Sequence, residues 1–170
     1  RKLILATSKD IRVLLVKIAD RLHNMRTLDS ISDENRKIRI AKETMEIYAP
    51  LSDRMGMNHI RDELEDLSFQ KLNPEARNLV VERLSVNKKS RENSFKEISN
   101  NFIKILKDNN IKVKIIGREK TPFSIWRKMQ SKRVSLEQLT DIVGFRVIVD
   151  DVKTCYKVLG IFHSNWSTIP

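Results

Sequence analysis

Apolar residues recur with the period of an α-helix over most of the first two thirds of the chain. The first predicted helix, which Ser8 or Asp10 can cap, runs to about Leu28. Its apolar residues fall within an arc of about 100°, and they are Ile11, Leu14, Leu15, Ile18, Leu22 and Met25. Further helices are predicted over 33–48, from 58 onward and over 74–109. Ala49-Pro50 is expected to end the second of these, and Gly56 to stop one further turn.

The pattern changes after Asp108-Asn109-Asn110. Residues 113–116 predict a short strand, and 142–149, rich in β-branched and aromatic residues, predict a stronger one. A helix from Thr121-Pro122 to about 133 separates them, and another follows from Asp151 through Trp166. The sequence therefore predicts an α+β fold, with an all-α segment at 1–108 and a strand–helix–strand–helix unit at 109–170.

Composition narrows the class of protein. The 170 residues are 40% apolar, with 4 Gly and 4 Pro, which excludes collagen-like, low-complexity and disordered chains. No apolar run approaches about 18 residues, so we expect no membrane span, and no secretory leader is recognised. The single cysteine, Cys155, fits a reducing compartment. The formal charge of +11 favours anionic partners such as nucleotides, nucleic acid or acidic membrane.

One group of polar residues shares a face of the first predicted helix. Asp20, Asn24 and Thr27 are spaced i, i+4, i+7. Apolar residues continue on this side toward the N-terminus, so we expect the first half of the helix to be buried. A carboxylate on a covered face is costly unless it is paired or metal-bound. Asp20 is therefore a candidate metal ligand, the alternative being a surface ion pair with Lys17 or Arg21.

A second group lies in a strongly basic stretch, residues 112–133, which holds eight cations against one carboxylate. Arg118 and Lys120 are spaced i, i+2 before a helix N-terminus, and Ser124 and Lys128 are spaced i, i+4 after it. Two cations, a helix end, a hydroxyl and a lysine form a candidate triphosphate cradle. The alternative is a solvated basic helix.

The run Val16 to Leu28, VKIADRLHNMRTL, resembles the end of the hydrolase domain of the RelA/SpoT family, the long bifunctional (p)ppGpp synthetase/hydrolases. The resemblance implies that Asp20 is a Mn²⁺ ligand of an HD-type site and that Asn24 and Thr27 face the guanine nucleotide. Residues 48–51 and 63–67 resemble the family's helical connector, although Ser52-Asp53 replaces its usual Ala-His.

The segment Gly117 to Met129, GREKTPFSIWRKM, resembles the family's ATP-binding segment, with Phe123 in place of the usual Tyr. The resemblance implies ATP contacts from Arg118, Lys120, Ser124 and Lys128. Residues 141–149 resemble the next motif, and Asp141 matches the catalytic aspartate that holds Mg²⁺ on the ATP phosphates. The expected fold of this part is the first portion of a nucleotidyltransferase-like synthetase domain.

Both implied sites are incomplete within the sequence. An HD site needs two histidines and two aspartates, yet no His-Asp dipeptide occurs, and His59 and His163 are interpreted as structural or surface residues. The acidic run at residues 62–66 is interpreted as a solvated helix face. The chain begins with Arg1 rather than Met, and we expect it to be an internal segment of a longer protein.

The function implied is that of a bacterial, cytoplasmic enzyme of the stringent response. It transfers pyrophosphate from ATP to GTP or GDP and removes the 3′-pyrophosphate of ppGpp. The segment alone is expected to do neither at a useful rate. One alternative is an ATP-binding or regulatory module that completes a site with a partner chain or by self-association. Another is non-specific RNA binding, with Phe123 and Trp126 stacking on bases, although Ile125-Trp126 is more typical of core packing. No membrane or specific nucleic-acid partner is expected.

Overall fold

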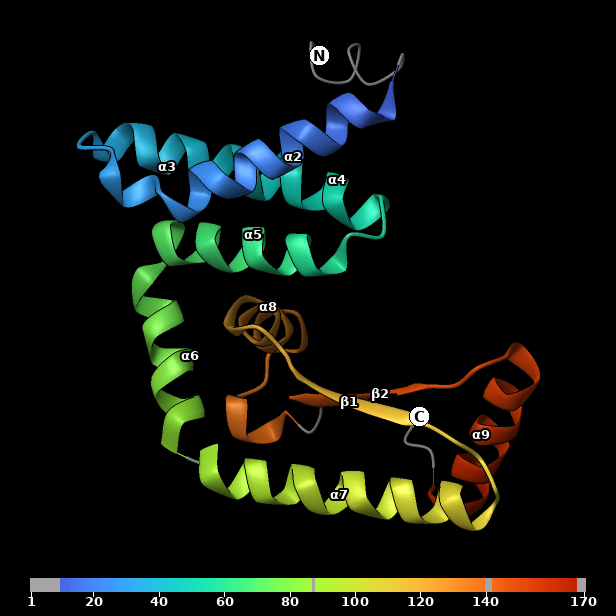
Figure 1. Cartoon of the computed structure of the whole chain (residues 1–170). Coiled ribbons are helices and arrows are strands. Elements are labelled where there is room, and N and C mark those ends of the chain that lie inside the picture. The colour runs from blue at the N-terminus through green and yellow to red at the C-terminus, as the bar shows by residue number, and fades with distance from the viewer. Residues whose placement is uncertain (1–9, 87, 140–141, 168–170) are drawn as a thin grey trace. The chain divides into compact units, whose positions relative to one another are not determined.

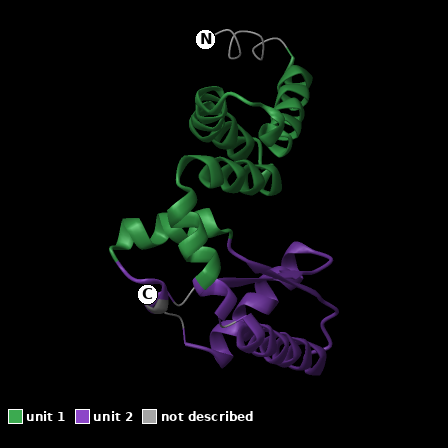
Figure 2. Ribbon diagram, turned by 90° about the vertical axis from the view of Figure 1, so that its left-hand side faces the viewer, with its two compact units in different colours: residues 1–82, 121–133 green, residues 83–120, 134–170 purple. Residues whose placement is uncertain are grey.

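The computed structural model describes residues 10–86, 88–139 and 142–167, and its elements are labelled in Figure 1. The chain divides into two compact units, shown in Figure 2. Unit 1 comprises residues 1–82 and 121–133, and unit 2 comprises residues 83–120 and 134–170. The chain therefore leaves unit 1, forms part of unit 2, and contributes one more helix to unit 1 before it returns.

Unit 1 is helical. Its elements are α2 (Ile11–Arg26), the 3₁₀ turn η1 (Leu28–Ser30), α3 (Glu34–Glu43), the π-helical turn η2 (Thr44–Tyr48), α4 (Ala49–Arg54), α5 (Asn58–Leu72), most of α6 (Pro74–Val86), and α8 (Pro122–Lys132). Three helix starts are capped, because the side chains of Asp10, Asp33 and Thr121 accept hydrogen bonds from nearby backbone N–H groups.

The second predicted helix does not end at Ala49-Pro50, so that prediction was wrong. The backbone widens into the π-turn η2, in which the N–H of Ala49 donates to the carbonyl of Thr44, and continues as α4. The wider turn accommodates a proline that has no N–H to offer the ladder. The helical path ends instead just before Gly56, as predicted. The φ of Gly56, +73°, lies in the left-handed region.

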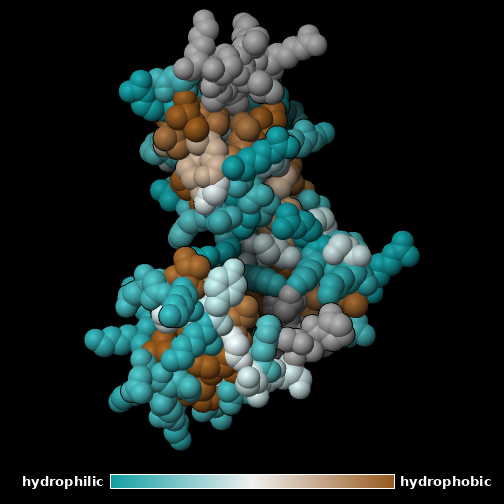
Figure 3. Space-filling view, turned by 90° about the vertical axis from the view of Figure 1, so that its right-hand side faces the viewer, coloured by the Kyte–Doolittle hydropathy of each residue, from teal (hydrophilic) through white to brown (hydrophobic). Residues whose placement is uncertain are grey.

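The core of unit 1 gathers the buried face of α2 with residues from the helices that follow; its buried members are Leu14, Ile18, Met25, Leu28, Ala41, Tyr48, Ala49 and Leu64. The first half of α2, however, is not covered all round. Ile11 and Val16 are 62% and 66% exposed, and Val13 and Leu15 are also exposed. The prediction that the first half of this helix is buried was therefore wrong for the described residues. Figure 3, coloured by the hydropathy of each residue, shows hydrophobic residues at the molecular surface on the side that it draws.

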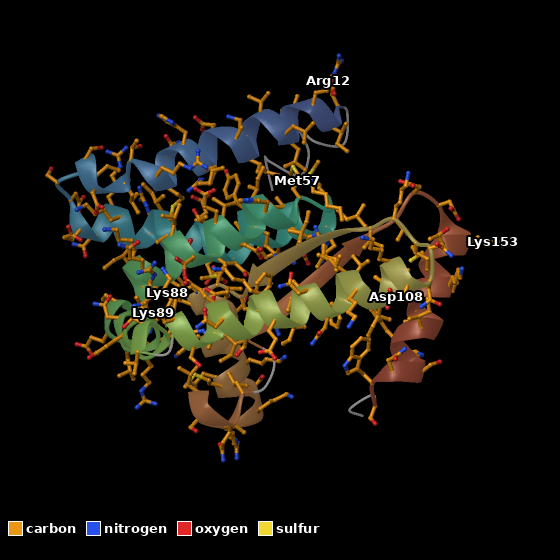
Figure 4. All side chains as sticks on the ribbon, turned by 60° about the horizontal axis from the view of Figure 1, so that its bottom comes forward. Arg12, Met57, Lys88, Lys89, Asp108 and Lys153 are labelled. Atoms are coloured by element: carbon orange, nitrogen blue, oxygen red, sulfur yellow. The ribbon has the colours of Figure 1, made fainter. Side chains whose placement is uncertain are left out.

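Unit 2 combines helices with a small sheet: α7 (Lys88–Asp108), β1 (Lys114–Glu119), the 3₁₀ turn η3 (Leu136–Gln138), β2 (Val143–Ile148) and α9 (Val152–Asn165). The strands are antiparallel, with Lys114 opposite Ile148 and Glu119 opposite Val143. Figure 4 labels Asp108, where α7 ends, and Lys153, near the start of α9. The predicted α+β class is confirmed.

One face of this sheet is covered. Its core contains Leu106, Ile111 and Val158, with Val147 packed against them. An aromatic cluster extends this core: Phe95 stacks on Phe145 at 4.7 Å, and Phe102 contacts the rings of Phe145, Phe162 and Trp166. The alternate side chains, among them Arg118 and Arg146, point to the exposed face.

None of the helices described combines the length and the hydrophobicity needed to cross a lipid bilayer.

Candidate functional site

The three polar residues singled out on α2 lie on its exposed side. The amide of Asn24 donates to Asp20 Oδ2 at 3.3 Å, and the hydroxyl of Thr27 donates to the carbonyl of His23 at 3.1 Å. Arg21, one alternative partner for Asp20, instead donates to Glu43 at 2.9 Å. Among the described residues, the Asp20 carboxylate thus accepts a hydrogen bond from an amide on its own helix.

The described residues do not form a metal centre by themselves. Within the ranges that the structure describes, no three side chains of His, Cys, Asp or Glu lie close enough together to hold a metal ion. His23, His59 and His163 are all exposed. Asp141, the predicted Mg²⁺ ligand, lies outside the described residues.

The end of β1 presents the first two residues of the predicted cradle. Arg118 is exposed, within β1, and Lys120 follows the last strand residue. The N–H of Lys120 donates to the carbonyl of Ile142 at 3.0 Å, so the ladder continues beyond Glu119. Alternation along an extended chain therefore directs Arg118 and Lys120 to the same side of the strand.

The other two residues lie on α8, which begins at Pro122. Ser124 and Lys128 are one turn apart and both half-buried. Thr121 Oγ1 accepts the N–H of Ser124 at 3.3 Å and donates to its hydroxyl at 3.0 Å. Pro122 has no N–H, so the start of α8 offers fewer free donors than a typical helix end. Any phosphate binding would therefore depend chiefly on side chains.

The apolar side of α8 packs against α5 within unit 1. Ile125 is fully buried, and the Phe69 ring lies 5.4 Å from that of Phe123 and 5.0 Å from that of Trp126. These contacts confirm the interpretation of Ile125-Trp126 as core packing. They favour it over the alternative in which Phe123 and Trp126 stack on bases.

The acidic run on α5 is not a solvated face, contrary to the prediction. Asp62 and Glu65 are only 8% and 7% exposed. Glu63 pairs with Arg26 of α2 at 2.6 Å, and this hydrogen bond lowers the pKa of Glu63. Helix α5 is enclosed by neighbours on several sides, so its carboxylates meet cations rather than water.

Glu65 is the residue in this run that the sequence interpretation missed. Arg127 Nη1 of α8 donates to Glu65 Oε1 at 3.2 Å, whereas Glu65 Oε2 is buried without a hydrogen-bond partner. Burial raises the pKa of Glu65, against the opposing effect of Arg127 and Arg61. The available signal was its spacing: Glu65 lies one turn before the buried Phe69, on the side of α5 that packs against α8.

In a comparison with known proteins, two family models match parts of the chain. Residues 1–58 match the model of the HD domain, and residues 117–170 match that of a region found in RelA / SpoT proteins. The Asp20 group falls in the first match, and all four cradle residues fall in the second.

Relatives that align with the whole of this chain agree with these matches. The chain is 51% identical over 170 residues to "GTP pyrophosphokinase rsh" of Brucella melitensis biotype 1. It is 44% identical to "Guanosine-3′,5′-bis(diphosphate) 3′-pyrophosphohydrolase" of Haemophilus influenzae and 43% identical to "Bifunctional (p)ppGpp synthase/hydrolase SpoT" of Escherichia coli K12. Each alignment covers 100% of the chain but only 22%, 25% and 24% of the respective relative.

The chain thus spans about a quarter or less of the length of these relatives, as expected for a segment of a long protein. An HD-domain match and a RelA/SpoT match follow one another on one polypeptide, and similarity to the relatives is continuous from residue 1 to residue 170. The predicted resemblance to the RelA/SpoT family is confirmed, and it extends along the whole of this chain.

Proposed function

We propose that the chain supplies the ATP-binding segment of a (p)ppGpp synthetase together with the end of its hydrolase domain. The whole enzyme would transfer pyrophosphate from ATP to the 3′-hydroxyl of GTP or GDP and would remove the 3′-pyrophosphate of ppGpp. The observation that carries this proposal is the uninterrupted similarity to relatives whose names state one or both activities.

On the synthetase side, Arg118, Lys120, Ser124 and Lys128 would contact the phosphates of ATP. A guanidinium and two ammonium groups provide charge-assisted hydrogen bonds to phosphate oxygens, and the Ser124 hydroxyl provides a further donor. Such fixed cations also stabilise the negative charge that develops during transfer. The exposed Arg118 at the end of β1 and the partial exposure of Lys128 on α8 support this role.

On the hydrolase side, Asp20 would be one Mn²⁺ ligand, and Asn24 and Thr27 would face the guanine nucleotide. Asp141 would be the catalytic aspartate that binds Mg²⁺ in the synthetase. Carboxylate oxygens suit both ions. The described residues contain no cluster able to hold either ion alone, so we assign no chemical step to a metal and expect further ligands from outside the described chain.

For the 170-residue chain by itself, the proposal predicts ATP binding without useful turnover. Titration calorimetry with ATP and Mg²⁺ tests the first part. Lys120→Ala and Lys128→Ala are each expected to weaken binding about tenfold or more, because a hydrogen bond to a charged group contributes about 1.5–3 kcal/mol. Lys153→Ala on α9 removes the same charge at an exposed position outside the matched cradle and is the control.

If both cradle variants bind ATP as the Lys153→Ala variant does, the assignment fails. Binding that depends steeply on salt and shows no preference for ATP over RNA would favour non-specific nucleic-acid binding instead. Assays with ATP plus GDP and Mg²⁺, and with ppGpp and Mn²⁺, test the second part. Clear turnover in either would show that the chain completes a site alone or by self-association.

A further inference from the structure

Helix α8 is held on α5 by two kinds of contact within unit 1. The Phe69 ring contacts those of Phe123 and Trp126. Beside these rings, Arg127 donates to the buried carboxylate of Glu65 at 3.2 Å. Arg127 is the residue immediately before Lys128, so this ion pair adjoins the proposed ATP-binding side chains.

We infer that Glu65 is a positioning residue, which holds Arg127 and thereby sets α8 so that Ser124 and Lys128 meet the phosphates of ATP. The inference rests on the proposed function for its ATP-binding part. Glu65 itself would not touch the nucleotide. Its effect would pass through the guanidinium of Arg127 to the rotation of α8.

The aromatic contacts alone do not fix that rotation. Ring contacts are broad in geometry, and centroid separations of about 4.5–7 Å are all favourable. A guanidinium is planar and directional, so its hydrogen bond to a carboxylate specifies orientation as well as distance. Arg127 also lies over the Phe123 ring at 5.4 Å, which anchors the same guanidinium from its own helix.

A contribution to the stability of the fold does not explain why a glutamate lies at position 65. Its carboxylate is buried, one oxygen has no hydrogen-bond partner, and burial raises its pKa. The charged groups near it are Arg127 of α8, Asp53 of α4 and Arg61 of α5. Their net effect does not offset the cost of burial. The Arg127 side chain is 60% exposed, so water can solvate it when Glu65 is replaced, and a neutral group at position 65 avoids the cost of a buried charge. Glu65→Gln is therefore expected to leave the free energy of unfolding unchanged or to raise it slightly.

The matched control lies two residues away on the same helix. Glu63 also pairs with an arginine, but its partner is Arg26 of α2 rather than a residue of α8. Glu63→Gln therefore removes an equal charge and an arginine ion pair from α5 without touching α8. Comparison of Glu65→Gln with Glu63→Gln separates the position of α8 from the general charge of α5.

Three measurements on the 170-residue chain test the inference: ATP affinity, hydrogen exchange and the unfolding midpoint. Calorimetry with ATP and Mg²⁺ is expected to show Glu65→Gln binding about two- to fivefold more weakly, the range for a partly exposed ion pair. Hydrogen exchange is expected to be faster in α8 for Glu65→Gln than for Glu63→Gln, while the unfolding midpoint of Glu65→Gln does not fall. Arg127→Gln is expected to reduce ATP affinity as much as Glu65→Gln does. The double variant is expected to bind ATP no more weakly than either single variant.

Unchanged ATP affinity in Glu65→Gln, while Lys128→Ala weakens binding, would overturn the inference alone. Tighter binding, or additive losses in the double variant, would also overturn it, since Glu65 would then oppose Arg127 or act apart from it. If neither Lys120→Ala nor Lys128→Ala changes ATP affinity, the proposed function fails. Hydrogen exchange in α8 then decides by itself whether Glu65 positions the helix. Equal rates of hydrogen exchange in α8 for Glu65→Gln and Glu63→Gln would refute the positioning role as well.

Discussion

Gly117 is a position in unit 2 at which an added side chain would meet the ring of Phe95. It lies in β1 opposite Phe145, and a Cβ built on it would overlap the ring of Phe95. That ring is stacked on Phe145 with planes 10° apart. Replacement of Gly117 by alanine therefore forces Phe95 away from the strand or forces the strand away from α7.

Three effects set the magnitude of Gly117→Ala. Added volume in a packed core costs about 1–3 kcal/mol, and loss of an aromatic pair costs about 0.5–1.5 kcal/mol. Alanine loses less conformational entropy than glycine on folding, which returns about 0.5–1 kcal/mol. The net expectation is a loss of about 2 kcal/mol in the free energy of unfolding of unit 2.

Denaturant unfolding followed by hydrogen exchange in α7 and β2 measures this loss for unit 2 separately from unit 1. Gly144→Ala is the matched control, because a Cβ there approaches Arg118 O only to 4.0 Å in the neighbouring strand. In a Phe95→Ala background the cost of Gly117→Ala is expected to fall below about 0.5 kcal/mol, as the clash is removed. A Gly117→Ala cost equal to that of Gly144→Ala would refute the reasoning.

Two further predictions concern unit 1. Thr121→Ala is expected to lower its free energy of unfolding by about 1 kcal/mol through loss of the α8 cap, whereas Thr121→Ser keeps the cap; helical circular dichroism during thermal unfolding distinguishes them, and equal midpoints would contradict the capping role. The lowered pKa of Glu63 means that its pair with Arg26 stabilises the fold above the ordinary glutamate pKa of 4.5 and loses this effect as pH falls through the lowered pKa. Urea unfolding across acidic pH should therefore show a shallower loss of stability in Glu63→Gln, and parallel curves for the two proteins would contradict it.

Features decided by nearby residues could be predicted from the sequence. At each of the caps Asp33, Thr121 and Asp151, a side-chain hydroxyl or carboxylate accepts a hydrogen bond from a backbone N–H three residues later. Pro50 shows the limit of this local reasoning. Its missing N–H does predict an interruption, but the chain resolves it by a π-turn within a continuing helical path.

Burial was harder to predict because it depends on partners distant in sequence. Val16 and Glu65 show the error in both directions: the apolar Val16 is exposed, and the charged Glu65 is buried. Glu65 meets its partner 62 residues later in the chain, a separation at which no periodic pattern carries information. Of the candidate site, the helix carrying Ser124 and Lys128 was predictable. The strand was predicted over 113–116, which stops short of Arg118 in β1, and the support behind α8 was not predicted.

The acidic run of α5 shows how one local pattern acquires several roles. Successive residues of a helix turn by 100°, so Glu63, Glu65 and Asp66 face different neighbours. Glu63 pairs with Arg26 of α2, Glu65 with Arg127 of α8, and Asp66 with Arg77 of α6 at 2.8 Å. A rotation of α5 by one residue would turn every carboxylate away from its arginine and break all three pairs together. The run therefore specifies the rotation of α5 relative to each neighbour, a requirement that a solvated acidic face would not have.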